Sequence, residues 1–280
     1  MAEATQTFGE RLQEHIRELG PLCVGVDPSS ELLLTWERTD TVEGLEFFSL
    51  AVLEAVIGVA VAIKPQVAFF ERFGSEGYRV LERLITEARD AQLLVVADAK
   101  RGDFANTNEG YAEAWLSDRS PLAVDAVTAH PYLGVGALAP LFTRASSSGR
   151  GVFVLAATSN GEGRELQQAV TQDHERVEDM VLNQVADLNR REGRLGSIGV
   201  VIGATRDAPR FDLATLSGPY LVPGVGAQGA GASDVARLFN GVQEGTVLVN
   251  VARDILSTGP ERRRLNDSAR RWRDDIRAAL

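Results

Sequence analysis

The stretch Leu93-Leu-Val-Val-Ala-Asp-Ala-Lys-Arg-Gly-Asp103 joins a run of apolar residues directly to a cluster of charges. The five apolar residues predict a short buried strand. Asp98, Lys100 and Asp103 follow where that strand meets a loop. Active sites of parallel α/β proteins are built at this end of their strands. The stretch therefore favours an α/β fold and indicates where its site lies.

Seven other short runs of β-branched or alanine-rich residues recur along the chain. They predict strands at residues 22–26, 59–63, 123–128, 152–157, 198–202, 219–222 and 246–249. Segments with the three- and four-residue spacing of helices lie between most of these runs. Eight strand–helix units in about 250 residues are typical of a (β/α)8 TIM barrel. A doubly wound open sheet built from the same elements is the alternative.

The domain organisation predicted from the sequence is a single barrel over residues 1–280. The chain contains no low-complexity linker and no break in composition. An extra amphipathic helix, ended by Gly20, is expected within residues 1–20. A second helix is expected over residues 260–280, where aspartates interrupt an arginine-rich run at helical spacing.

Net charge and apolar patterning exclude several classes of protein. The 280 residues carry a formal net charge of −10, and such a chain has no basic field to attract nucleic acid. No apolar run approaches the length of a membrane span. Charged residues at Glu3, Glu10 and Arg11 argue against a secretory signal. We expect a cytoplasmic protein with no membrane or nucleic-acid partner.

Cysteine and histidine give no sign of a metal site. Cys23 is the single cysteine and lies in an apolar run, so we interpret it as a core residue. His15, His130 and His174 are far apart in the sequence and lack zinc-ligand spacing. We interpret His130 as a packing or hydrogen-bonding residue.

Only two of the 29 basic residues are lysines, Lys64 and Lys100. Arginine keeps its proton at any working pH and is a poor general acid. Lysine offers a compact ammonium and a proton that can be transferred. Both lysines lie at predicted strand ends, which favours a functional role for them over a chance occurrence.

A barrel brings all eight strand ends to one rim. The polar and glycine positions that follow the predicted strands are Asp27, Lys64, Asp98, Lys100, Asp103, Thr128, His130, Thr158, Ser159, Gly203, Thr205, 224–228 and 250–253. On an extended strand end, Asp98 and Lys100 point to the same side. With Lys64 and Asp103 they would form an interlocked charge cluster. The structural alternative is an ion-pair belt that closes the barrel mouth, although buried ion pairs stabilise less than apolar packing.

The last two strand ends have the pattern of a phosphate site. Val222-Pro-Gly-Val-Gly-Ala-Gln-Gly229 is a glycine-rich turn whose backbone N–H groups can approach an anion closely. Val249-Asn-Val-Ala-Arg253 then supplies a guanidinium. Phosphate sites of TIM barrels commonly lie after strands seven and eight. The two segments together therefore predict a phosphorylated ligand.

These residues together resemble the orotidine 5′-monophosphate decarboxylase family over roughly residues 20–256. The signature Asp98-x-Lys100-x-x-Asp103 with Thr107 is present, and Asp27, Lys64, Pro223-Gly-Val-Gly-x-Gln228 and Arg253 follow in the family's order. Thr158-Ser-Asn160 and His130-Pro-Tyr-Leu-Gly134 are similar to the longer bacterial branch. Two positions depart from the pattern: Phe104 replaces an aliphatic residue, and serines are missing before Arg253. Neither departure removes a group that the reaction requires.

The resemblance implies conversion of orotidine 5′-monophosphate to UMP and CO2 in pyrimidine biosynthesis, without a cofactor or metal ion. It implies that Lys100 lies beside C6 of the pyrimidine and supplies the proton. Asp98 would lie close to the leaving carboxylate. Lys64 and Asp103 would complete the charge network. Electrostatics would then carry the stabilisation of the carbanion.

The resemblance also implies a homodimer in which Asp103 and Thr107 reach the neighbouring subunit's site. Asp27 and Lys64 would contact the ribose, Ser159 the pyrimidine, and Gln228 with Arg253 the phosphate. The complete set of implied substrate-binding residues is Asp27, Thr107, Thr158, Ser159, Gly226, Gln228, Ala252 and Arg253.

Two other functions remain open from the sequence. Related barrel enzymes act on sugar phosphates and need a magnesium ion. They resemble one another in having a glutamate after the second strand, where this chain has Lys64. The positive charge of Lys64 would repel the metal. A non-catalytic barrel that only binds a phosphorylated ligand would need no more than the glycine turn and Arg253. The segment after Ser159, with Glu162, Arg164 and His174, is interpreted either as a lid or as plain surface.

Overall fold

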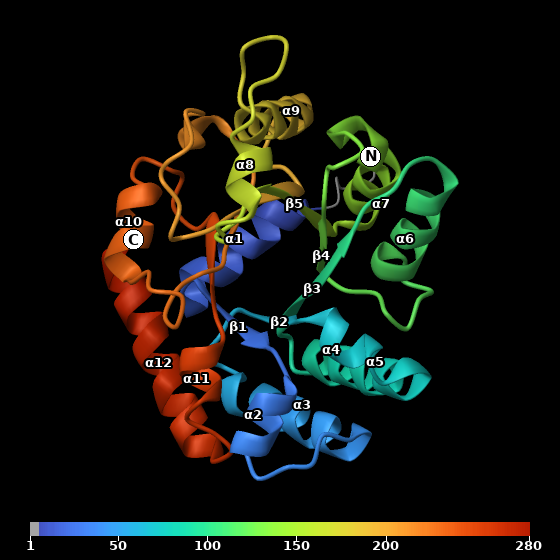
Figure 1. The fold of residues 1–280 in the computed structure, drawn as a ribbon, viewed down its shortest axis with the longest axis vertical. Coiled ribbons are helices and arrows are strands. Elements are labelled where there is room, and N and C mark those ends of the chain that lie inside the picture. The colour runs from blue at the N-terminus through green and yellow to red at the C-terminus, as the bar shows by residue number, and fades with distance from the viewer. Residues whose placement is uncertain (1–5) are drawn as a thin grey trace.

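Eight parallel strands close into a barrel in sequence order (Figure 1). The computed structural model describes residues 6–280. The strands are β1 (Leu22–Val26), β2 (Ala62–Pro65), β3 (Leu94–Arg101), β4 (Ala126–Ala129), β5 (Gly151–Ala157), β6 (Ile198–Ile202), β7 (Tyr220–Val222) and β8 (Val247–Val251). Strand β8 pairs with β1 and closes the ring. The predicted TIM barrel is confirmed, and the open sheet is excluded.

Helices surround the barrel and link successive strands. The α-helices are α1 (Phe8–Leu19), α2 (Ser30–Thr35), α3 (Val42–Val56), α4 (Val67–Glu71), α5 (Gly74–Asp90), α6 (Asn106–Leu116), α7 (Ala139–Ser148), α8 (Gly163–Gln167), α9 (Val177–Glu192), α10 (Ala232–Leu238), α11 (Arg253–Leu256) and α12 (Arg262–Ala279). Two 3-10 turns are η1 (Val135–Leu138) and η2 (Leu213–Thr215). Outward-facing strand residues and the inner faces of these helices form the larger hydrophobic core.

Helix α1 closes the amino-terminal end of the barrel. Its N-cap is Thr7, which forms a capping box with Glu10. Phe8 and Leu12 are fully buried and belong to a second core, made with residues that face the barrel interior. The Phe8 ring packs edge-on against Phe153 of β5, with 5.8 Å between centroids. This helix was expected within residues 1–20, of which the first five lie outside the described residues. With this end filled, the interior is accessible only from the opposite rim.

Three strand boundaries differ from the predicted ones by three residues or more. Strand β2 begins at Ala62 rather than residue 59, because the N–H groups of Val59 and Ala60 still bond to Val56 O at the end of α3. The run at 123–128 likewise begins pairing only at Ala126. Strand β3 continues to Arg101, beyond the predicted end at residue 97. The charged residues of β3 are therefore held in the sheet and not in a loop.

Alternation along the strands brings polar side chains to the interior of the rim. Successive residues of a strand point to opposite faces. Four strands change from an interior apolar residue to an interior polar one two positions later: Ala62 to Lys64, Val96 to Asp98, Ala126 to Thr128, and Leu248 to Asn250. On the other side of the rim the interior residues stay apolar.

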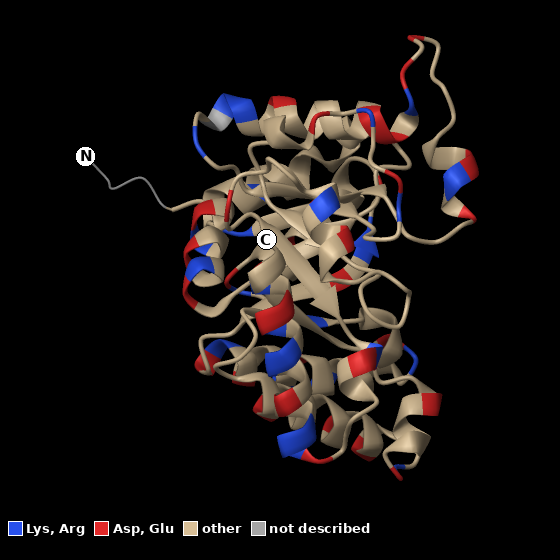
Figure 2. Cartoon of the chain, turned by 90° about the vertical axis from the view of Figure 1, so that its left-hand side faces the viewer, with Lys and Arg blue, Asp and Glu red and all other residues tan. Residues whose placement is uncertain are grey.

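Charges on the outer surface are mixed in sign, and Figure 2 shows acidic and basic residues interspersed over the helices. On α12, Arg263 pairs with Asp267 across one helical turn. This helix packs against α3 and α10, and most of its arginines face solvent. The helix predicted over residues 260–280 corresponds to α12, which spans residues 262–279. Within residues 6–280, every helix is too short or too polar to cross a membrane.

Candidate active site

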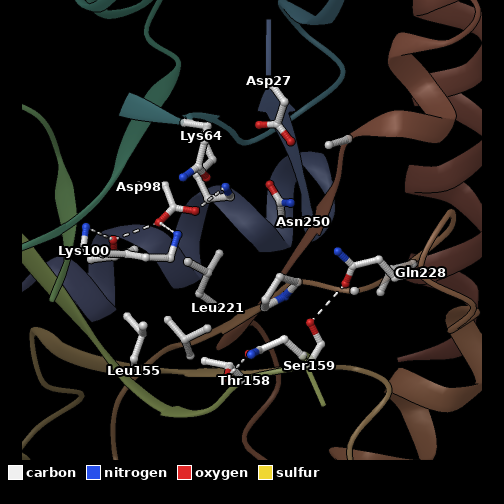
Figure 3. A pocket seen from close by; sticks show the side chains of 18 of the residues that line it. Asp27, Lys64, Asp98, Lys100, Leu155, Thr158, Ser159, Leu221, Gln228 and Asn250 are labelled. Carbon is white, nitrogen blue, oxygen red and sulfur yellow. Dashed lines mark hydrogen bonds and ion pairs between the residues drawn. The ribbon is translucent and has the colours of Figure 1, made fainter. Parts of the chain in front are cut away.

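A pocket of about 490 Å³ opens at the carboxyl ends of the strands (Figure 3). Its charged and polar lining consists of Asp27, Lys64, Gln66, Asp98, Lys100, Thr128, Thr158, Ser159, Asn160, Gln167, Gln228, Asn250 and Arg253. Leu155, Val201 and Leu221 form an apolar wall from β5, β6 and β7. One side of the pocket is thus charged and the other apolar. Such a shape suits a flat ring that carries polar groups at one edge.

Asp98 lies between the two lysines of the chain. Its Oδ2 accepts a hydrogen bond from Lys64 Nζ at 2.7 Å, and its Oδ1 accepts one from Lys100 Nζ at 2.6 Å. The Lys64 side chain is only 5% exposed, whereas that of Lys100 is 47% exposed. Lys64 is therefore a fixed internal charge, and Lys100 presents its ammonium to the open part of the pocket.

Mutual attraction keeps Lys64 and Asp98 ionised. Burial by itself would raise the pKa of Asp98, but the charges of Lys64 and Lys100 and their hydrogen bonds hold that pKa far below its usual range. Burial would lower the pKa of Lys64, but Asp98 and Asp27 hold it above its usual range. Lys64 and Asp98 therefore keep their charges over the whole physiological pH range. The site carries fixed charges before any ligand binds.

An irregularity in β3 aligns Lys100 with Asp98. The register with β4 shifts between Ala97 and Arg101, and Lys100 has a φ of 45° in the left-handed region. Thr128 Oγ1 accepts the Lys100 N–H at 2.9 Å and donates to Asp98 Oδ1 at 3.0 Å. One hydroxyl thus fixes both the strained backbone and the carboxylate. The sequence predicted that the two side chains share a side, but not that Thr128 holds them.

Two buried polar atoms of the pocket have no hydrogen-bond partner among the described residues. They are Asp27 Oδ1, just after β1, and Asn250 Oδ1, on β8. Burial raises the pKa of the Asp27 carboxyl, and the attraction of Lys64 only partly offsets this effect. Both atoms therefore offer unmet hydrogen-bonding capacity to a ligand.

Asp27→Asn is expected to raise the melting temperature by a few degrees at pH 7. The pKa of Asp27 is higher in the folded state than in the unfolded state. The free energy of unfolding therefore falls as pH rises from the unfolded-state pKa to the folded-state pKa, and it stays lowered at higher pH. Asparagine removes that cost, so the gain should vanish below about pH 4, where the carboxyl is neutral in both states. Thermal unfolding of both proteins from pH 3 to 8 measures it. A gain that persists at pH 3 would contradict this explanation.

The glycine-rich turn after β7 and the start of α11 form the predicted phosphate end of the pocket. Gln228, Ala252 and Arg253 line it. Gly226 does not line it but sustains the turn, with φ 81° and Asp254 Oδ2 only 2.7 Å from where a Cβ would lie. Ser159 Oγ donates to Gln228 Oε1 at 3.0 Å. This bond joins the loops that follow β5 and β7 across the pocket mouth.

The loop after β5 is held by α8. Gln167 Oε1 accepts the Thr158 N–H at 3.1 Å, and its Nε2 donates to Thr158 Oγ1 at 2.8 Å. Thr158 and Ser159 line the pocket as predicted, together with Gln167, which the sequence analysis missed. Gln167 reaches Thr158, nine residues earlier in the chain, because α8 turns back toward this loop. Of the further lid candidates, Glu162, Arg164 and His174 do not line the pocket, and His174 lies in a separate depression.

Asp103 and Thr107 lie outside the pocket of their own chain. Asn108 fixes the turn that carries them: its Oδ1 accepts the Asp103 N–H at 3.1 Å, and its Nδ2 donates to Asp103 O and Ala137 O at 2.5 and 2.6 Å. Thr107 is exposed. Three of the four predicted charged groups therefore meet within one chain, and Asp103 is held apart from them. His130 is no pocket residue either and packs against Gly102.

Candidate metal ligands do not cluster: within residues 6–280, no three histidine, cysteine, aspartate or glutamate side chains are grouped as a metal site requires. Cys23 is buried below the pocket, and burial raises the pKa of its thiol to about 12. It stays a neutral core residue, as expected.

The fold and the site define a TIM-barrel enzyme with a lysine–aspartate–lysine array and a glycine-rich turn at its rim. A family model described as "Orotidine 5'-phosphate decarboxylase / HUMPS family" matches residues 20–267. The orotidine 5′-phosphate decarboxylases of Salinispora tropica and Streptomyces coelicolor are each 48% identical to this chain, over 98% of its length and 99% of theirs. The chain belongs to the orotidine 5′-phosphate decarboxylase family.

Solved structures show the same relationship. A crystal structure from Streptomyces avermitilis has a TM-score of 0.94 and 48% identity, and the match covers 99% of this chain and 96% of that one. The OMP decarboxylase of Leishmania donovani has a TM-score of 0.75 and 29% identity, over 98% of this chain and 99% of its own. The barrel fold is therefore shared with these two solved structures.

Proposed function

We propose that this protein converts orotidine 5′-monophosphate to UMP and CO2. The observation that carries the proposal is the ionised Lys64–Asp98–Lys100 array, fixed at the open end of the barrel. Loss of CO2 leaves an electron pair on C6 of the pyrimidine that the ring does not delocalise. A fixed ammonium beside C6 stabilises that charge without any reorganisation during the reaction.

Lys100 is the proposed proton donor. Its side chain is more exposed than that of Lys64, and a lysine ammonium can act as a general acid. The bond from C6 to the carboxylate breaks, CO2 departs, and the pair left on C6 takes a proton from Lys100 Nζ. Asp98 would lie near the departing carboxylate and keeps Lys100 oriented. Lys64 keeps Asp98 charged throughout.

The rest of the nucleotide would bind along the pocket. Asp27 and Lys64 contact the ribose, Ser159 the pyrimidine, and Gln228 with Arg253 the phosphate. Thr158, Gly226 and Ala252 shape the loops around these groups. The Ser159–Gln228 bond links the pyrimidine loop to the phosphate loop. Phosphate binding, far from C6, can therefore organise the site where the reaction occurs.

Lys64 argues against a magnesium-dependent sugar-phosphate enzyme of the same superfamily. Mg²⁺ requires oxygen ligands, and here the ammonium of Lys64 lies 2.7 Å from the Asp98 carboxylate. A cation next to that ammonium would be repelled. A barrel that only binds a phosphorylated ligand would have no use for an ionised array beside the apolar wall.

The test is decarboxylation of orotidine 5′-monophosphate by the wild-type protein in the presence of EDTA, followed by ultraviolet absorbance. We expect multiple turnovers that excess EDTA does not slow. Absence of turnover by the folded protein would overturn the proposal, and activity that requires added Mg²⁺ on a sugar phosphate would support the rival function.

We further propose a homodimer in which Asp103 and Thr107 complete the partner subunit's site. Both residues lie outside their own pocket on a turn fixed by Asn108. Three large apolar side chains near them are exposed: Phe104, Tyr132 and Leu133. An apolar group beside outward-facing functional residues favours contact with a second copy.

Mixing two inactive variants tests this arrangement. Lys100→Ala and Asp103→Ala homodimers should each be nearly inactive. After exchange of subunits, half of the dimers are mixed, and each mixed dimer has one site with both side chains intact. We expect about a quarter of wild-type activity to return. No recovery after exchange verified by native mass spectrometry would show that Asp103 serves its own subunit.

A further inference from the structure

We propose that Asn250 is a further substrate-binding residue, which hydrogen-bonds a ribose hydroxyl of the nucleotide; this inference rests on the function proposed above. Asn250 lies on β8, two residues after Leu248, whose side chain belongs to the barrel interior. The residue is 7% exposed and lines the pocket. Its Oδ1 is buried and has no partner among the described residues.

The two fully buried asparagines of the described chain show what a structural asparagine does here. Asn189 donates to Ile198 O and Leu216 O at 2.8 and 3.1 Å and accepts the Ile198 N–H at 3.3 Å. Asn108 makes three hydrogen bonds to backbone groups. Both amides hold loops together. Asn250 makes no such bond, so its amide does not stabilise the fold in this way.

An unsatisfied buried amide oxygen destabilises the free protein, since the oxygen has lost water and gained no hydrogen-bond donor. The neighbouring strand offers no compensation, because Asn250 is in register with Cys23, whose thiol is a weak hydrogen-bonding group. A polar ligand that enters the pocket would supply the missing bond. The observation thus indicates a ligand-binding role for the Asn250 side chain.

The position of Asn250 in the pocket indicates which part of the nucleotide it would contact. In Figure 3, Asn250 lies below Asp27 and between the Lys64–Asp98–Lys100 array and Gln228. The array is the proposed reaction end, and Gln228 belongs to the proposed phosphate end. In a nucleoside monophosphate the ribose joins these two ends. Asn250 and Asp27 would therefore face the ribose from the same side of the pocket.

The chemistry of the two side chains is complementary. The Asp27 carboxylate can only accept hydrogen bonds, whereas an amide can accept and donate. A ribose has two neighbouring hydroxyls, each able to donate and to accept. Asp27 and Asn250 could each take one of them, which would make the site selective for ribonucleotides over deoxyribonucleotides. A pocket built to bond a hydroxyl rejects ligands that lack it.

The experiment compares Asn250→Ala and Asn250→Leu with the wild type. Dissociation constants for UMP, 2′-deoxy-UMP and 3′-deoxy-UMP are measured by titration calorimetry, which does not depend on turnover. We expect the wild type to prefer UMP over both analogues. Each variant should bind UMP about tenfold more weakly and lose most of its preference over one of the two analogues. The melting temperature of Asn250→Leu should be equal to or above that of the wild type, because an unpaired polar group is removed.

Asn266→Ala is the matched control. The Asn266 amide on α12 donates to Ala55 O at 2.7 Å, and neither residue lines the pocket. This variant should lose stability and retain all three dissociation constants.

Two results would overturn the inference: unchanged UMP affinity in both Asn250 variants, or an equal loss for all three nucleotides. A wild type that binds no UMP would overturn it as well. A wild type that binds UMP with ribose selectivity but does not decarboxylate orotidine 5′-monophosphate would overturn the proposed function and leave the Asn250 comparison valid.

Discussion

Lys100→Ala is expected to lower kcat for decarboxylation of orotidine 5′-monophosphate by at least about 10⁴-fold. The substitution removes the proton donor and the charge beside C6 together, and each of these contributes about 10²–10⁴-fold in typical enzymes. The fold should survive, because the Lys100 side chain is 47% exposed and the buried Lys64–Asp98 pair stays intact. The measurement is the EDTA-containing absorbance assay, with thermal unfolding as the check on stability.

Lys100→Arg separates charge from proton transfer. Arginine retains a positive charge near Asp98 but does not release its proton at working pH. We expect this variant to be nearly as inactive as Lys100→Ala while it keeps the melting temperature of the wild type. Substantial activity in Lys100→Arg would mean that Lys100 acts only as a charge. Substantial activity in Lys100→Ala would remove it from the mechanism.

Lys64→Met is expected to be the most destabilising single substitution in the pocket and to abolish turnover. Lys64 is nearly inaccessible and is bonded to Asp98 at 2.7 Å. Its removal leaves the Asp98 carboxylate desolvated with the half-exposed Lys100 as its charged partner and the Thr128 hydroxyl as a neutral one. Breaking a buried ion pair in this way costs about 3–5 kcal/mol. For a chain of this size the melting temperature should fall on the order of 10 °C.

The double variant Lys64→Met, Asp98→Leu is the control for this explanation. Replacing both partners of a buried ion pair by apolar residues of similar volume is often neutral or stabilising. We expect much of the lost melting temperature to return while the protein stays inactive. If the double variant were as unstable as Lys64→Met, the loss would come from packing around the lysine stem and not from the uncompensated Asp98 charge.

Much of the fold follows from local patterns. A buried strand in a parallel sheet needs a short apolar run, and eight such runs alternate with amphipathic segments along this chain. The errors at strand boundaries have a local cause as well. Val59 and Ala60 have the composition of a strand, but their N–H groups are used by the end of the preceding helix. The β-propensity of a residue does not show whether its N–H group is already bonded to a neighbouring helix.

The site was partly predictable for the same reason. Closure of a barrel places every strand end on one rim. The sequence therefore predicts that four charged residues lie together there: Asp27, Lys64, Asp98 and Lys100. The sequence places Thr128 on the rim without a role, and it does not predict Gln167 at all. Their roles depend on a register shift in β3 and on the return of α8 to the loop after β5. Neither the register shift nor the return of α8 can be predicted from the spacing of residues in the sequence.

The sequence by itself determined the barrel, the residues at its open rim and the chemistry that two retained lysines can perform. These properties depend on residue type and on short-range periodicity. Only the tertiary structure decided that Lys64 is buried and Lys100 exposed, that Asp103 does not line its own pocket, and that Asn250 Oδ1 has no partner among residues 6–280. Burial and hydrogen-bond satisfaction are properties of packing, because they depend on which atoms from distant segments surround a side chain.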